Sequence, residues 1–312
     1  MIDIGTLPQM GDELFLTDGG LETDLIFHRG VDLPLFASFV LHEDPSAEVV
    51  VRDYFRDYLR IGADMGLGMV FETLTWRASS DWGDQLGYDA ARLSAVNERA
   101  AAFLLELRAV EADSPVVVSG CVGPRGDAYA DLGSMSSDDA QSYHSAQIEV
   151  LAASGVDLVS ALTITNTPEA IGIVRAAADR GVPVVVSFTV ETDGTLPTGE
   201  RLADAIEAVD GATGAAAAYF MVNCAHPDHF AEVLAGGDPS LRRVRGVRAN
   251  ASRKSHAELD EAEDLDDGDP VEFGAQLAEL RSRDPQITVL GGCCGTDHRH
   301  VNEIGQACSL RS

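Results

Sequence analysis

The sequence predicts an α/β protein, a single (β/α)8 TIM barrel in which residues 1–312 form one domain. Short valine-rich apolar runs alternate with longer amphipathic stretches from end to end, as in a parallel sheet whose strands are joined by helices. Eight strand–helix units in 312 residues fit a closed barrel. An open doubly wound sheet is the alternative, but no Gly-x-Gly-x-x-Gly follows the first apolar run, which argues against a dinucleotide-binding fold.

The predicted elements follow these two patterns in order. Strands are expected at Leu14–Asp18, Gly68–Thr73, Pro115–Gly120, Asp157–Ala161, Pro183–Phe188, Ala217–Asn223, Val244–Ala249 and Ile287–Leu290. Helices are expected at Ala47–Ile61, Asp89–Glu111, Ser137–Ser154, Pro168–Arg180, Arg201–Val209, Asp228–Ala235, Pro270–Ser282 and Asp297–Ala307. The segment from Ser255 to Pro270 is rich in Asp and Glu and poor in apolar residues, so we expect a solvated loop there.

The composition is strongly acidic, with 22 basic and 51 acidic residues and a formal net charge of −29. Such a chain repels nucleic acid, and a solvated acidic surface is favoured over a patch for a cationic partner. No run of 18 apolar residues occurs, and Met1–Gly5 lacks the features of a signal peptide. We therefore expect a soluble, cytoplasmic protein without membrane contact. The sequence leaves the oligomeric state open, a homo-oligomer included.

The pair Cys293–Cys294, inside Gly291-Gly292-Cys293-Cys294-Gly295, is the most informative motif. Adjacent thiols between glycines add little to a core but suit a soft metal such as Zn2+. Cys224 ends another predicted strand and provides a third sulfur. Three protein ligands leave one position open, which is typical of a catalytic zinc site. The alternative is that the three thiols are small buried hydrophobes, as we expect for Cys121 and Cys308.

A zinc ion held by three thiolates suits one kind of chemistry in particular. The thiolates' charge makes the ion a poor generator of hydroxide. A substrate thiol in the fourth position, however, loses its proton at neutral pH and stays nucleophilic. The sequence thus predicts alkyl transfer to sulfur. A lyase or hydrolase that uses the metal as a Lewis acid is a weaker alternative, because the all-sulfur ligand set disfavours it.

Several motifs stand in the order and spacing of a known family: Asp18-Gly19-Gly20, Gly120-x-Val122-Gly123-Pro124, Ser187-Phe188, Val222-Asn223-Cys224 and Gly291-Gly292-Cys293-Cys294-Gly295. Over nearly its whole length the chain resembles the zinc-dependent homocysteine S-methyltransferases. The resemblance implies a (β/α)8 barrel, zinc on Cys224, Cys293 and Cys294, and methyl transfer from an onium compound to a thiol. It also implies that Asp18, with the backbone of Gly19 and Gly20, helps to hold the amino-acid end of the acceptor.

Two departures from the family's pattern concern the acceptor. The family usually has a glutamate at the end of the fourth strand, where this chain has Leu162. After the second strand, Thr73-Leu74-Thr75-Trp76-Arg77 replaces the usual Thr-Asn-Thr-Tyr-Gln and follows Glu72. We expect Glu72 to supply the missing negative charge from a different strand.

The remaining candidate residues also fall near strand ends, where barrel active sites lie. The aromatic face of Trp76 is suited to an onium cation, which has no hydrogen-bond donor. The expected substrate contacts are Asp18, Gly19, Gly20, Glu22, Glu72, Thr73, Trp76, Thr163 and Asn223. A helix-terminal role is favoured for His226 over metal ligation, and we expect His298 and His300 on the surface.

The predicted function is zinc-dependent methyl transfer from a small onium donor to a zinc-bound thiol. S-methylmethionine, S-adenosylmethionine, a betaine and a dimethylsulfonio compound are the candidate donors, since the chain has no second module to carry a methyl group. Homocysteine, giving methionine, is the expected acceptor. The alternatives are a different thiol acceptor and a non-catalytic protein that binds zinc or a thiol metabolite.

Overall fold

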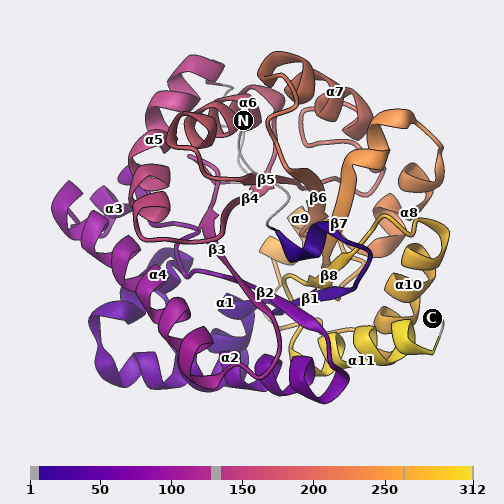
Figure 1. Ribbon diagram of the computed structural model, residues 1–312, viewed down its shortest axis with the longest axis horizontal. Helices are drawn as coiled ribbons and strands as arrows, with labels where there is room; N and C mark the ends of the chain where they lie inside the picture. The colour runs from indigo at the N-terminus through magenta and orange to yellow at the C-terminus, as the bar shows by residue number, and fades with distance from the viewer. Residues whose placement is uncertain (1–6, 128–134, 263, 311–312) are drawn as a thin grey trace.

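The computed structural model describes residues 7–127, 135–262 and 264–310, so Met1–Gly5 lies outside the described residues. Within them, eight parallel strands close into a barrel in which each strand pairs with the next and β8 returns to β1 (Figure 1). The (β/α)8 prediction is confirmed. The strands are β1 Phe15–Thr17, β2 Gly68–Glu72, β3 Val116–Val122, β4 Leu158–Ile164, β5 Val184–Phe188, β6 Tyr219–Asn223, β7 Val244–Ala249 and β8 Val289–Gly292.

Helices surround the strands (Figure 1). They are α1 Leu21–Thr23, α2 Pro45–Met65, α3 Ser80–Gln85, α4 Ala90–Glu111, α5 Ser137–Ala153, α6 Thr167–Arg180, α7 Leu202–Thr213, α8 Pro227–Ala235, α9 His256–Asp260, α10 Pro270–Arg283 and α11 His298–Ser309. Shorter 3-10 or π turns are η2 Pro8–Met10, η3 Asp24–His28, η4 Pro34–Phe36, η5 Ser38–Glu43 and η6 Pro239–Arg243. None of the described helices has the length and apolarity needed to cross a lipid bilayer.

Local sequence explains how the helices begin and end, as α2 illustrates. The Asp44 side chain accepts a hydrogen bond from Ser46 N, Pro45 occupies the first turn, and Gly66 ends the helix with φ +67°. Between these caps, α2 buries one face against the barrel, including Phe55. Polar side chains also cap the N-termini of α4, α5, α6 and α10, whereas the N-cap of α7, Arg201, makes no such hydrogen bond.

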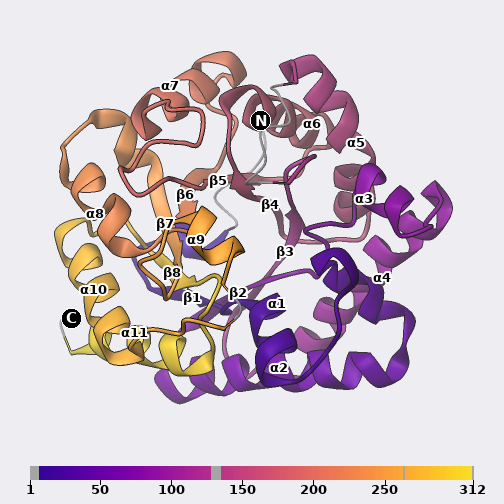
Figure 2. The same ribbon diagram turned by 180° about the vertical axis from the view of Figure 1, so that it is seen from behind.

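The two ends of the barrel differ. At the amino end, η2 closes the interior: Gln9 is fully buried, and its carbonyl accepts a hydrogen bond from Thr288 Oγ1 at 2.8 Å. Seen from the opposite side, α1 and α9 lie near the ends of the strands (Figure 2). The carboxyl end of the barrel is the open one, because residues that follow the strands, such as Cys224 and Cys293, line a cavity there.

The segment Ser255–Pro270 departs from the expected loop. Its first part is the helix α9, which begins with a capping box: Ser255 Oγ accepts from Glu258 N, and Glu258 Oε2 accepts from Ser255 N. The solvated-loop prediction was wrong here, because local capping outweighed the shortage of apolar residues. Glu263, within the same segment, lies outside the described residues.

Candidate metal and acceptor site

Three cysteines meet at the open end of the barrel. Cys224 follows β6, and Cys293 and Cys294 follow β8. The strand between them fixes both segments: Cys224 N donates to Arg248 O at 3.1 Å, and Cys293 N donates to Ala249 O at 2.7 Å. The register of three parallel strands thus brings together thiols that lie some 70 residues apart in the chain.

The ligand atoms of Cys224, Cys293 and Cys294 lie within 4.8 Å of one another. The Sγ atoms of Cys224 and Cys294 are 3.6 Å apart. Cys224 adopts φ +58°, an uncommon conformation for a residue with a side chain, and such strain often marks a functional position. Within the described part of the chain, no other group of three or more His, Cys, Asp or Glu residues is arranged to hold a metal.

Electrostatics at the thiols favours a bound cation. Hydrogen bonds from the Cys224 and Cys294 thiols lower the pKa of Cys293, and the positive charge of Arg248 lowers it further. The pKa of Cys294 is raised by its contacts with the other two sulfurs. Three sulfurs this close cannot all ionise unless a cation compensates their charge. The donor set therefore fits a soft metal ion with three thiolate ligands.

Asn223 ties the sulfur cluster to two further strands. Its Oδ1 accepts from Thr163 N at 2.9 Å and from Ser187 Oγ at 2.7 Å, while its Nδ2 donates to Thr163 Oγ1 at 2.9 Å. The same Nδ2 lies 3.9 Å from Cys293 Sγ. The structure thus brings the predicted residues Asn223 and Thr163 together, and their hydrogen bonds fix the Asn223 side chain beside Cys293.

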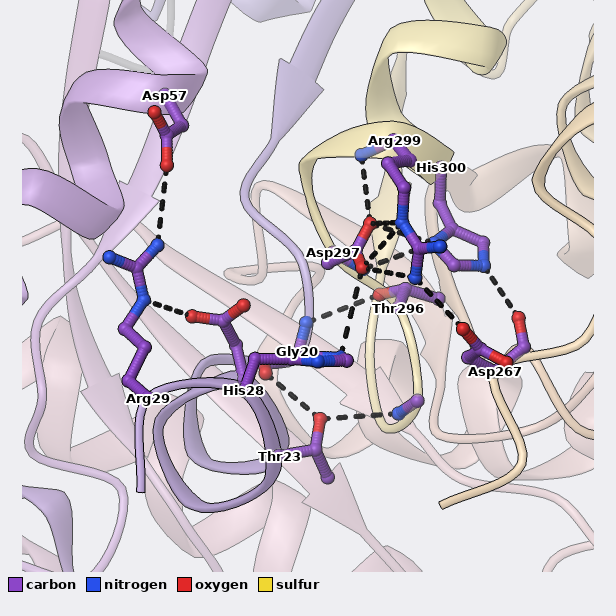
Figure 3. A network of polar contacts seen from close by, with 12 residues as sticks. Gly20, Thr23, His28, Arg29, Asp57, Asp267, Thr296, Asp297, Arg299 and His300 are labelled. Carbon is purple, nitrogen blue, oxygen red and sulfur yellow. Dashed lines mark hydrogen bonds and ion pairs between the residues drawn. The ribbon is translucent and has the colours of Figure 1, made fainter. Parts of the chain in front are cut away.

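The loop that carries Cys293 and Cys294 is fastened to the first strand (Figure 3). Gly20 N donates to Thr296 O at 3.0 Å, and Thr23 Oγ1 accepts from Gly295 N at 3.2 Å. A Cβ atom on Gly20 would lie 2.4 Å from Cys293 O, so no side chain fits there without movement. This close approach explains why a glycine follows Gly19 at the end of β1.

Asp297 anchors the far side of the same loop (Figure 3). Burial alone would raise the pKa of Asp297, but hydrogen bonds from His300 and Arg299 hold it well below its usual range. Asp267 extends the network, because its carboxylate pairs with Arg299 at 2.8 Å and its carbonyl oxygen lies 2.8 Å from His300 Nε2. The surface position expected for His300 was wrong, since its side chain is fully buried. His298 is exposed.

The sulfur cluster opens into a cavity of about 490 Å3. Every site residue predicted from the sequence lines it: Asp18, Gly19, Gly20, Glu22, Glu72, Thr73, Trp76, Thr163, Asn223, Cys224, Cys293 and Cys294. Leu162, the residue in place of the family's glutamate, lines it as well and accepts a hydrogen bond from Trp76 Nε1 at 3.2 Å. The cavity therefore unites the candidate metal ligands with the candidate substrate contacts.

A buried charge cluster forms part of the cavity wall. Arg248 Nη2 lies 3.0 Å from Asp18 Oδ1, and Arg248 Nη1 lies 3.8 Å from Glu72 Oε1. Burial raises the pKa of Glu72 to about 7, although the charge of Arg248 opposes this shift. Burial likewise raises the pKa of Asp18, against the effects of Arg248 and Tyr54. Glu72 is thus poised to change charge near neutral pH.

Glu22 is a second carboxylate in the cavity. Its Oε1 accepts from Ser38 Oγ at 2.8 Å, and burial raises its pKa. Trp76 also lines the cavity, and the Arg77 guanidinium is 5.0 Å from the centre of its ring. A cation therefore already contacts this aromatic side chain.

Sequence reasoning missed several residues of the cavity wall, namely Arg248, Asn250, Ser252, His256 and Asp266. Arg248 was detectable, because charged residues such as Arg245 and Arg248 are unusual inside a predicted barrel strand. The pattern Ser255-x-x-Glu258 would have predicted the start of α9 and thereby placed His256. His256 Nε2 lies 2.6 Å from Cys224 O, so α9 contacts a candidate ligand residue directly.

His226 and Cys121 are the two remaining candidates. His226 is the N-cap of α8, where its Nδ1 accepts from Asp228 N at 3.1 Å, which confirms the helix-terminal role. Burial raises the pKa of the Cys121 thiol well above its ordinary value, so this thiol is protonated at neutral pH. Its position in the cavity wall agrees with a packed thiol.

Comparison with known proteins gives the family. The family model for homocysteine S-methyltransferases matches residues 15–308, which is nearly the whole barrel. This chain belongs to the homocysteine S-methyltransferase family. Homocysteine S-methyltransferase 4 of Zea mays is 27% identical over 94% of this chain and 88% of its own length. Selenocysteine Se-methyltransferase of Brassica oleracea var. italica is 24% identical over 93% and 87%.

A solved structure has the same fold. The homocysteine methyltransferase MmuM from Escherichia coli, in its metallated form, superposes with a TM-score of 0.72 at 22% identity and covers 97% of both chains. The family assignment makes this protein a methyltransferase, as the sequence predicted. As a member of the homocysteine S-methyltransferase family, it joins relatives named for methyl transfer to the sulfur or selenium of an amino acid.

Proposed function

We propose that this member of the family moves a methyl group from a small onium donor to the sulfur of homocysteine, giving methionine, with zinc held by Cys224, Cys293 and Cys294. The observation that carries the proposal is the cluster of three sulfurs within 4.8 Å at the wall of a 490 Å3 cavity. A closed four-ligand site would be structural, whereas three ligands facing a cavity leave room for a substrate atom.

The donor set supports zinc over other metals, because thiolates are soft ligands and a tetrahedral geometry needs only one further atom. That the Escherichia coli homocysteine methyltransferase exists in a metallated form supports a metal in this protein as well. When bound, zinc would supply a positive charge that lowers the pKa of the acceptor's thiol and leaves its sulfur nucleophilic. The chain's own residues then have to bind and orient the two substrates.

The charged residues of the cavity provide that orientation. Glu72 places a carboxylate in the cavity wall, where it suits the acceptor's ammonium group. Trp76 and Glu22 are proposed to face the onium donor, whose cation is attracted by an aromatic ring and by negative charge. A donor and an acceptor held in line at about 3–3.5 Å react without the entropy cost of a bimolecular encounter.

Thiol binding is expected to release a proton from the zinc-loaded protein. A free thiol has a pKa of roughly 8.5 and keeps its proton at pH 7, whereas a metal ligand must be a thiolate. Titration calorimetry with homocysteine in two buffers of different ionisation enthalpy measures the number of protons released. A parallel assay of methyl transfer, with the candidate onium donors and with homocysteine or selenocysteine as acceptor, identifies the substrates. Zero proton release would contradict the mechanism.

The Glu72 carboxylate is expected to impose a pH dependence on acceptor use. Because its pKa is raised to about 7, Glu72 is largely neutral below pH 7 and charged above it, so ammonium binding should strengthen as the pH rises through 7. Glu72→Gln should lower kcat/KM for homocysteine by roughly ten- to a hundredfold at pH 8 and remove this rise. The charged groups facing Glu72 are Arg248, which lowers its pKa, and Asp18, which raises it.

The des-amino analogue 4-mercaptobutanoate is the control, because it has the same thiol and no ammonium group. Dividing kcat/KM for homocysteine by kcat/KM for this analogue removes the effect of thiol ionisation common to both. The ratio should rise through pH 7 in the wild type and stay flat in Glu72→Gln. If the variant keeps the wild-type ratio at every pH, Glu72 does not bind the ammonium group.

A further inference from the structure

Arg248 is a positively charged side chain inside the barrel, and only some of its N–H groups have hydrogen-bond partners. Its side chain is about 6% exposed. Nε donates to Gly292 O at 3.2 Å, and Nη2 donates to Gly19 O at 3.3 Å and pairs with Asp18. Nη1 makes no hydrogen bond with any described residue. A buried N–H group without a partner is costly, so a missing partner is expected there.

Glu72 also has a buried polar atom without a hydrogen-bond partner. Its Oε1 lies 3.8 Å from Arg248 Nη1, which is beyond hydrogen-bond distance, and its Oε2 has no hydrogen-bond partner among the described residues. Both side chains line the cavity. If an arginine and a carboxylate served only to pair with each other, their nitrogen and oxygen atoms would be expected about 2.8 Å apart. Here the two groups are held slightly apart, and each keeps an unused polar atom.

The spacing suits a ligand that carries both charges on neighbouring atoms. In an α-amino acid the ammonium and carboxylate groups are attached to one carbon. A carboxylate can accept from the unused N–H groups of Arg248, and an ammonium group can donate to the unused oxygen of Glu72. Asp18 Oδ1 also makes no hydrogen bond with a described residue, but it is ion-paired with Arg248 at 3.0 Å, and its Oδ2 accepts from Tyr54 OH at 3.1 Å, so Asp18 is less available to the ammonium group than Glu72.

We propose that Arg248 is a specificity residue that anchors the carboxylate of the acceptor, with Asp18 as the group that positions its guanidinium. The inference rests on the proposed function and deepens it, since it restricts the acceptor to thiols that carry a carboxylate beside the ammonium group. It revises the role expected for Asp18, which supports Arg248 and does not itself bind the amino-acid end. Glu72 and Arg248 together form a receptor for a zwitterion.

Direct binding to the zinc-loaded wild type tests the proposal without any turnover. Methionine has the product's sulfur and both charged groups, 3-(methylthio)propylamine lacks the carboxylate, and 4-(methylthio)butanoate lacks the ammonium group. Calorimetry should give a Kd for each analogue that is roughly ten- to a hundredfold weaker than the Kd for methionine. Equal affinity of methionine and 3-(methylthio)propylamine would overturn the proposal.

Variants assign the effect to one side chain. Arg248→Met should weaken methionine binding by roughly ten- to a hundredfold and leave 3-(methylthio)propylamine within about twofold. Equal weakening of all three ligands would overturn the proposal, because it would show that Arg248 only supports the loop through Gly292. Arg245→Met is the matched control: Arg245 is on the same strand, contacts Gly11 O and does not line the cavity, so this variant should bind like the wild type.

Asp18 would be left buried without its partner in Arg248→Met, and this variant could unfold. Arg248→Lys keeps the charge and should retain the wild-type order of the three ligands with weaker methionine binding. The comparison of the three ligands on the wild type needs no variant at all.

The methyl-transfer assay separates the two proposals: transfer to thiols regardless of a carboxylate would leave the proposed function standing and overturn the role of Arg248. Absence of transfer to any thiol would reject the function itself.

Discussion

Alanine at any one of Cys224, Cys293 or Cys294 is expected to abolish zinc binding at physiological zinc concentrations, and methyl transfer with it. Two remaining thiolates cannot retain an ion whose site needs three protein ligands, because structural and catalytic zinc affinities depend on ligand number. Elemental analysis of the purified wild type should find about one zinc per chain, and each variant should hold almost none. Full zinc occupancy in Cys293→Ala would show that the site is assigned wrongly.

Cys308→Ala is the matched control for the loss of a buried thiol. Cys308 lies in α11 and does not line the cavity, so this variant should keep its zinc. Circular dichroism of the metal-free wild type separates a catalytic from a structural ion. The barrel is held by its own packed core, so the spectrum should be nearly unchanged after chelation. A large loss of helical signal would mean that the metal supports the fold.

Gly20→Ala is expected to have the second largest effect. The new Cβ would lie 2.4 Å from Cys293 O and 2.5 Å from Thr23 Oγ1, and one of these contacts is to backbone that cannot rotate away. The loop of Cys293 and Cys294 must shift, so we expect roughly a ten- to hundredfold loss of zinc affinity, the scale found when groups that orient metal ligands are changed. Overpacking should also lower the free energy of unfolding by about 1–3 kcal/mol.

Gly211→Ala provides the comparison, because it adds the same methyl group at a glycine in α7 with open space around the new Cβ. Alanine is favoured over glycine in a helix by about 1 kcal/mol, so this variant should be unchanged or slightly more stable. Competition with a chromophoric chelator measures zinc affinity, and urea titration measures stability. If Gly20→Ala binds zinc as tightly as Gly211→Ala, the tight approach of β1 to the loop does not position the ligands.

The barrel was predictable because its evidence is repetitive. The strands are short, mostly apolar runs, and β7 has the bounds Val244–Ala249 that the sequence predicts. The sulfur cluster was predictable because three thiols placed after strands have few other uses, and all strand ends of a parallel barrel meet at one edge. Both inferences need only the periodicity of the chain and the position of a residue relative to a strand end.

The other features of the site could not be predicted, because they depend on contacts between segments that are distant in the sequence. Arg248 could be noticed as a charge in a strand, but only the structure shows it between Asp18 and Glu72. His300 looked like a surface residue of a helix. It is buried, and the carbonyl oxygen of Asp267, from another loop, lies within hydrogen-bond distance of its Nε2. Tertiary partners decide such positions, and a pattern read along one chain does not contain them.

The origin of the three sulfurs also sets the order of events during folding. Cys224 follows β6, its two partners follow the last strand, and their loop is fastened to Gly20, which lies just after the first strand. A growing chain therefore lacks two of the three sulfurs until its final strand has been made, and the loop becomes fixed only when that strand meets β1. If these sulfurs hold the proposed zinc, we expect its uptake to follow barrel closure, and a firmly held ion would then report that the chain has reached its native topology.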